Sequence, residues 1–132
     1  MSYKHILVAV DLSESSKAVI DKAVSLAKDD NCKLSFVFVD VDKVAPVRKE
    51  DLILQNKLQT LAEQSGYPIT ETLFVIGDLH IKLAAIVKEM DIDLVVCGHH
   101  HKFLSRLFST VPKIINAVTT DILIVCLENN DG

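Results

Sequence analysis

The hydrophobic positions of this chain form two kinds of pattern, which alternate from end to end. Short runs are continuously apolar and rich in β-branched residues, as expected of parallel strands that are covered on both faces. Between these runs, apolar residues recur at three- and four-residue spacing, which predicts amphipathic helices. The runs predict strands at residues 6–10, 34–39, 71–76, 94–97 and 122–127.

The helical segments carry start and stop signals as well as an apolar face. Asp11 or Ser13 can cap the first helix and Asp78 the third. Gly66, which precedes a proline by two residues, is a typical stop for the second helix, and a polar connection over residues 40–49 leads into that helix. The predicted helices cover residues 14–28, 54–65, 79–90 and 111–118, the last of them started by Ser109 or Thr110.

This alternation predicts a three-layer α/β/α sandwich around a five-stranded, parallel, doubly wound sheet. We expect residues 1–132 to form a single domain, with a polar tail over residues 128–132 that frays. In such sheets, ligands bind beyond the carboxyl ends of the strands, where the winding direction reverses. That rule selects Asp11, residues 39–42 and the loop that begins at Gly98 as the places for a small-molecule site.

The composition is that of an ordinary globular chain and argues against several classes of function. Hydrophobic residues make up 49% of the 132 residues, yet no apolar run approaches the roughly 20 residues that span a bilayer. No amino-terminal export signal is visible, so we expect a cytoplasmic protein without a membrane partner. The net charge is -4 and the lysines are scattered among acids, which argues against nucleic acid as a partner.

The three cysteines predict free thiols rather than a disulfide framework. Cys97 and Cys126 lie within apolar runs, where cysteine acts as a small buried hydrophobe in a reducing compartment. No serine lies in a nucleophile elbow, and no cysteine has a nearby base in an exposed loop that the sequence identifies, so we predict no catalytic residues and no enzymatic activity. Paired carboxylates are expected to lie in solvated turns; they are Asp29 and Asp30, Asp40 and Asp42, and Asp91 and Asp93.

Three consecutive histidines, His99, His100 and His101, follow the fourth predicted strand. Imidazoles are common zinc ligands, but adjacent side chains point in different directions and no further ligand pair lies nearby. We therefore predict neither a metal nor another cofactor, and expect His99 to pack in the loop while the other two are more exposed. His5 and His80 are expected to be ordinary surface or edge residues.

The segment from Ile6 to Ser15, ILVAVDLSES, resembles the opening of the universal stress proteins. Matching features continue through Val39-Asp40, Gly77-Asp78, residues 93–99 and residues 122–125, so the resemblance covers essentially the whole chain. The run CGHH resembles the universal stress protein A-like branch, in particular its small C and D types. The resemblance implies an adenine nucleotide alpha hydrolase-like sheet of order 3-2-1-4-5, a cytoplasmic homodimer and a role in stress survival.

Nucleotide-binding members of that family carry a glycine-rich loop whose backbone amides wrap the phosphates at a helix start. If Gly98 is the first glycine of that loop, the second glycine position holds His101, the third holds Val111, and the serine or threonine position that follows holds Pro112. If the loop is aligned from the last strand instead, the third glycine position holds Phe108 and the serine or threonine position holds Ser109. Either way two of three glycines are missing, and the lost conformations and amide contacts would weaken ATP binding by about a thousandfold.

The resemblance also matches two other residues to positions that hold the ribose and the adenine in nucleotide binders. These are Asp11 and Val39, so a nucleotide site in this chain would consist of Asp11, Val39, Gly98 and Ser109. Asp11 has a second interpretation as the cap of the first helix, and this one is favoured.

The last predicted strand is apolar without alternation and, in the sheet order that the resemblance implies, lies at the rim. It contains no lysine or proline that would block pairing, so its edge needs a cover. Pairing of two copies about a twofold axis would satisfy its backbone groups and give an isologous dimer. The predicted interface residues are Ile122, Leu123, Ile124, Val125, Cys126 and Leu127.

A second apolar group consists of Phe103, Leu104, Leu107 and Phe108. We expect these side chains to pack on the sheet, with docking of a protein partner as the alternative.

Together these features predict a homodimeric, non-enzymatic stress protein that acts through protein contacts, without a cofactor and without high-affinity ATP binding. Heterodimers with paralogues stay open. Two alternatives also stay open: an ATP-binding stress sensor with weak or slow ATPase activity, and a metal-sensing module built on the histidine run.

Overall fold

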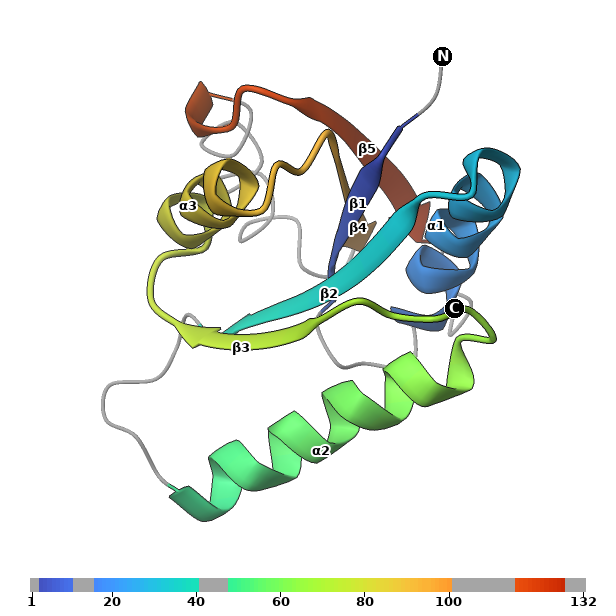
Figure 1. Ribbon diagram of the computed structural model, residues 1–132. Coiled ribbons are helices and arrows are strands. Elements are labelled where there is room, and N and C mark those ends of the chain that lie inside the picture. Colours follow the sequence, from blue (N-terminus) through green and yellow to red (C-terminus); the bar gives the residue numbers. More distant parts are fainter. Residues whose placement is uncertain (1–2, 11–15, 41–47, 101–115, 128–132) are drawn as a thin grey trace.

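The computed structural model describes residues 3–10, 16–40, 48–100 and 116–127, and they contain a five-stranded sheet (Figure 1). All neighbouring strands are parallel, and their spatial order is β3-β2-β1-β4-β5. The strands are β1 (His5–Ala9), β2 (Lys33–Asp40), β3 (Thr72–Ile76), β4 (Leu94–His100) and β5 (Asp121–Leu127). The parallel doubly wound sheet and its order are therefore confirmed.

The helices of the described residues are α1 (Ser16–Asp30), α2 (Arg48–Gln64) and α3 (Leu79–Glu89). Residues 116 and 117 are also helical, at the end of the fourth predicted helix, whose earlier residues lie outside the described ones. α2 begins inside residues 40–49, for which the sequence predicts a polar connection. Its first turn, residues 48–51, is charged throughout, so no apolar spacing reveals the start of the helix.

Two apolar cores lie on opposite faces of the sheet. α1 and α2 cover one face, where Ile6 and Val8 of β1 join a cluster that includes Leu58 of α2. α3 covers the other face, where Leu7 of β1 joins a cluster that includes Leu83. The alternation follows from the pleat of a strand, which sends successive side chains to opposite faces. Because Ile6, Leu7 and Val8 are all fully buried, β1 lies at the centre of both cores.

The predicted end of α2 is confirmed, whereas the predicted side-chain cap of α3 is not formed. Gly66 follows α2 with a φ of 77°, the left-handed conformation that ends a helix, as predicted. Asp78 does occupy the N-cap position of α3, with φ -76° and ψ 127°, but its carboxylate makes no capping hydrogen bond, so that part of the prediction is wrong. The Asp78 side chain is exposed, and its backbone carbonyl instead accepts a hydrogen bond from the N–H of Lys82 at 3.0 Å. The predicted caps of α1, Asp11 and Ser13, lie outside the described residues.

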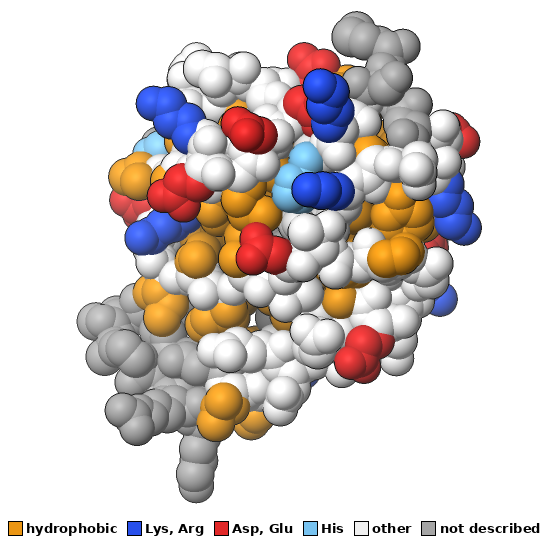
Figure 2. All heavy atoms as spheres, in the orientation of Figure 1, with side chains coloured by type: hydrophobic (Ala, Val, Ile, Leu, Met, Phe, Trp, Pro, Cys, Tyr) orange, Lys and Arg blue, Asp and Glu red, His pale blue; other side chains and the backbone are white. Residues whose placement is uncertain are grey.

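Cys32 and Cys97 are buried free thiols, as the sequence predicts. The Cys126 side chain lies outside the described part of the chain. None of the helices in the described ranges is long and apolar enough to cross a membrane. On the face of the molecule shown in Figure 2, acidic and basic side chains are interspersed.

Candidate functional site

The carboxyl ends of β1, β2 and β4 form the edge at which the sequence places a ligand site. Ala9, the last residue of β1, pairs with Val37 of β2 on one side and with Cys97 of β4 on the other. β2 and β4 continue past this level and bring Val39 and Gly98 to the same edge, one on each side of β1. Since the winding direction of the sheet reverses between β1 and β4, this edge is the expected ligand position of the fold.

The candidate nucleotide residues are only partly brought together by the described structure. Val39 is half-buried and packs against the core on the α3 side, in register with Val75 of β3. Its apolar side chain therefore has a packing role that needs no ligand. Asp11 and Ser109, the two polar members of the candidate site, lie outside the described residues.

β4 does not end where the sequence predicts. The apolar run stops at Cys97, which predicts a loop from Gly98 onward. Instead β4 continues to His100, because β5 is long enough to supply pairing partners. The length of β4 is therefore set by backbone hydrogen bonding rather than by side-chain burial. The added pairs are Gly98 with Val125, His99 with Cys126, and His100 with Leu127.

This extension decides how the backbone amides of residues 98–100 are directed. In an extended strand, successive N–H groups point to opposite sides, and those on the β5 side take part in the ladder. A phosphate cradle requires a curled backbone whose amides converge on one point. Residues 98–100 therefore form no such cradle.

The thiol next to this edge is chemically quiet. Cys97 is 8% exposed, and burial raises its pKa to about 11. The thiolate is the form that attacks electrophiles and binds metals, and at neutral pH it is scarce here. The side chains of His99 and His100, and the whole of His101, lie outside the described residues. Within the described part, no three histidine, cysteine or acidic side chains gather as a metal site would require.

A buried serine–histidine pair lies at the opposite, amino-terminal end of the strands. Nε2 of His5 is 2.7 Å from Oγ of Ser35, and the two residues are 7% and 0% exposed. The prediction that His5 is an ordinary surface or edge residue is therefore wrong, whereas His80 is half-exposed on α3. His5 begins β1 and shares a face with Leu7, so the alternation of β1, extended by one residue, would have revealed its burial.

This pair does not have the features of a catalytic site. Both groups are closed off from solvent, so a substrate cannot reach the serine oxygen. The nearby carboxylate of Asp93 accepts a hydrogen bond from the backbone N–H of His5 at 3.0 Å, whereas the acid of a catalytic triad bonds to the ring itself. The pair therefore has a structural role.

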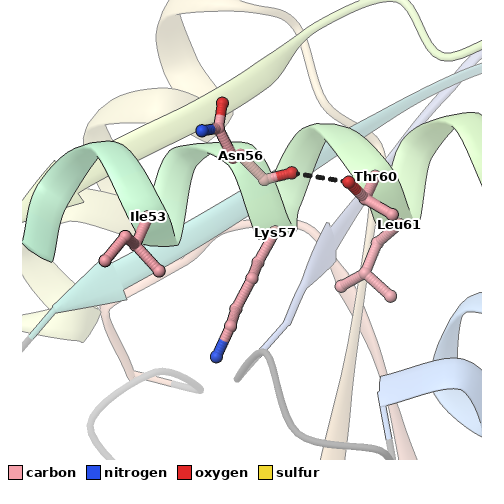
Figure 3. Close-up of a pocket in the computed structure, with 5 residues that line it drawn as sticks. All are labelled: Ile53, Asn56, Lys57, Thr60 and Leu61. Atoms are coloured by element: carbon pink, nitrogen blue, oxygen red, sulfur yellow. Dashed lines mark hydrogen bonds between the residues drawn. The ribbon is translucent and has the colours of Figure 1, made fainter.

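In the described part of the chain, two shallow recesses lie beside α2, and the described residues that line them include neither Val39 nor Gly98. The first has a volume of about 410 Å³, and its lining residues all come from α2: Ile53, Asn56, Lys57, Thr60 and Leu61 (Figure 3). The Thr60 hydroxyl donates to the backbone carbonyl of Asn56 at 2.8 Å. The second recess, of about 380 Å³, lies between α2 and β3 and is lined by Gln55, Asn56, Leu58, Gln59, Thr72 and Phe74. These lining residues include no carboxylate, thiol or imidazole, so they supply no acid–base pair.

Comparison with known proteins places the chain in a family. It matches the model of the universal stress protein family over residues 2–125. It is 43% identical to universal stress protein A of Escherichia coli strain K12 in an alignment of 143 positions that covers 99% of each chain. The identity to universal stress protein A of Salmonella typhi is also 43%, in an alignment of 146 positions that covers 99% of each chain.

Solved structures of this family share the fold. A universal stress protein in complex with cAMP superposes with a TM-score of 0.70 at 28% sequence identity, covering 95% of this chain and 98% of the other. A universal stress protein from Archaeoglobus fulgidus superposes with a TM-score of 0.74 at 20% identity, covering 97% and 96%. The predicted adenine nucleotide alpha hydrolase-like fold is thereby confirmed. The chain belongs to the universal stress protein family, in its universal stress protein A-like branch.

Proposed function

We propose that this chain is a homodimeric cytoplasmic stress protein without enzymatic activity, which acts through protein contacts and holds no nucleotide at high affinity. The observation that carries the proposal is the continuation of β4 through His100, paired with β5. A backbone that stays extended past the carboxyl edge of the sheet cannot direct several amides at one phosphate group.

The sequence that follows β4 also argues against high-affinity nucleotide binding. The positions that carry glycines in nucleotide-binding relatives are occupied by His101 and Val111, or by Phe108 in the other alignment. Side chains at these positions would occupy the space of a phosphate group and disfavour left-handed backbone conformations. ATP should therefore bind in the millimolar rather than the micromolar range, a loss of about a thousandfold.

The homodimer is proposed at the β5 edge of the sheet. Among the residues that the structure describes, β5 has a strand neighbour, β4, on one side only. It is apolar from Ile122 to Leu127, with no lysine or proline to block pairing. Antiparallel pairing of two copies of β5 about a twofold axis would use the backbone groups on the outer side of both strands. The same edge could accept a paralogue with a matching strand, which gives a heterodimer.

A nucleotide-binding stress sensor is the second candidate, because one relative of 28% identity has been solved in complex with cAMP. In this chain the ligand would meet Val39 and Gly98, which lie at one edge of the sheet, together with Asp11 and Ser109. Slow ATP hydrolysis is a further property that this candidate allows.

Acid extraction and calorimetry distinguish the two candidates. We expect the extract of the purified protein to contain no adenine absorbance, and titration with ATP and magnesium, or with cAMP, to show no saturation below about 50 μM. Saturation below that concentration would overturn the proposal. In that event Asp11→Asn should abolish binding, whereas Asp78→Asn, a change at the exposed aspartate before α3, should leave it intact.

A further inference from the structure

His5 joins three parts of the chain at the amino-terminal ends of the strands. Its ring contacts the Ser35 hydroxyl of β2 at 2.7 Å, and its second partner is the backbone carbonyl of Met90, at the end of α3. Its backbone N–H donates to the Asp93 carboxylate at 3.0 Å, and its carbonyl accepts from the N–H of Asp93 at 3.1 Å. The start of β1 is thus fastened to β2 and to the α3–β4 connection through this residue.

The neutral form of the imidazole suits these partners. A neutral ring has one N–H and one free nitrogen, so it can donate to the Met90 carbonyl while Nε2 accepts the hydroxyl proton of Ser35. A protonated ring has donors only, so Nε2–H can then bond to Ser35 Oγ only if the hydroxyl proton turns away from the ring and loses its acceptor. Both side chains are buried, so no solvent is at hand to replace a lost partner.

Three charged side chains influence the ring, and they are Lys33, Asp93 and Glu71. Burial is the largest influence and lowers the pKa of His5 below its ordinary value of 6.5, and the cation of Lys33 on β2 acts in the same direction. The Met90 carbonyl and the carboxylates of Asp93 and Glu71 oppose that shift but do not outweigh burial.

We propose that His5 is an acid-responsive clasp: neutral, it fastens the amino-terminal ends of β1 and β2 to the α3–β4 connection, and protonated, it releases them. The device lies at the end of the sheet opposite to Val39 and Gly98. It therefore works whether or not the chain binds a nucleotide.

The sign of the effect follows from proton linkage. The unfolded chain binds a proton at the ordinary pKa of 6.5, whereas the folded chain binds it only at a lower pH. The stabilisation is complete above pH 6.5 and is lost as the pH falls from there through the folded pKa. The folding equilibrium constant falls by about tenfold for each unit that separates the two pKa values.

Urea unfolding at pH 7.5 and pH 5 tests the clasp, with wild type, His5→Gln and His80→Gln compared. Glutamine keeps hydrogen-bonding groups but does not titrate, so we expect His5→Gln to lose part of the acid destabilisation that wild type shows. His80→Gln, at the half-exposed histidine of α3, should keep the wild-type response. Equal acid destabilisation in wild type and His5→Gln would overturn the proposal.

Two spectroscopic readouts keep the test valid if His5→Gln does not fold. An NMR titration of wild type should show the His5 ring protonating below pH 6.5, and Ser35→Ala should raise its pKa, because the neutral form loses a donor. Amide exchange should show that acid reduces protection at Lys33 and Asp93, which lie beside the clasp, more than at Val10, which bonds to Val37 at the far end of β1. A His5 ring that protonates at or above pH 6.5, or equal loss of protection at both ends, would contradict the clasp.

Discussion

At the scale of single residues, the main corrections concern polar side chains in or beside strands. The sequence identifies Asp91 and Asp93 as members of a solvated turn, and Asp91 fits this, with a φ of 53° and an exposed side chain. Asp93 instead accepts the backbone N–H groups of Lys4 and His5 at 2.7 and 3.0 Å. The partners of Asp93 lie 88 and 89 positions away in the sequence, and Ser35 lies 30 positions from His5. Such separations leave no local signal, so neither contact could be predicted.

Replacement of Asp93 tests how much this carboxylate stabilises the start of β1. We expect Asp93→Ala to lower the free energy of unfolding by about 1–3 kcal/mol, because two backbone donors lose a charged acceptor. Asp91→Asn is the matched control and should change the free energy of unfolding by less than about 0.5 kcal/mol, since asparagine tolerates the left-handed conformation. Urea unfolding at neutral pH measures both, and a neutral effect of Asp93→Ala would contradict the assigned role.

At the scale of elements, the type of each strand and helix that the structure describes could be predicted because burial leaves a periodic pattern. Boundaries were predicted less well where something other than apolar burial sets them. The charged first turn of α2 and the histidine end of β4 are the two examples: helix hydrogen bonding extends the former, and pairing with β5 extends the latter. Both errors made the predicted elements too short.

Helix α3 offers a matched pair of substitutions that tests its packing. Leu83 is fully buried in the core on the α3 side, whereas Ile81 on the same helix is 55% exposed. Leu83→Ala should lower the free energy of unfolding by about 2–5 kcal/mol, through lost burial and the cavity left behind. Ile81→Ala should change it by no more than about 0.5 kcal/mol. Comparable losses from the two variants would mean that the face of α3 is misassigned.

At the scale of the whole molecule, the layer order and the sheet order were predictable, because alternating strands and helices admit few right-handed arrangements and the family resemblance selects one. Half of the candidate nucleotide site, Val39 and Gly98, lies where that order places it. The sequence could not show that the strand carrying Gly98 stays extended, since that depends on the register between β4 and β5.

The proposed dimer can be tested at the two edges of the sheet. Ile124→Lys on β5 should give a monomer of 14.6 kDa by light scattering, because a lysine on an edge strand opposes pairing with a second copy. Ile76→Lys, on the opposite edge strand β3 where Ile76 is 36% exposed, should leave the proposed dimer intact. A wild-type chain that is monomeric, or a dimer that resists Ile124→Lys and is lost in Ile76→Lys, would refute the β5 interface.

The amides of Gly98, His99 and His100 report most directly on whether the carboxyl end of the sheet, where β4 ends, can hold a triphosphate. An NMR titration with ATP and magnesium should leave their resonances without a saturable shift up to about 1 mM, as expected of an extended strand paired with β5. Saturable shifts of these amides with a midpoint below about 50 μM would show that the backbone does form a phosphate cradle, and would contradict the account.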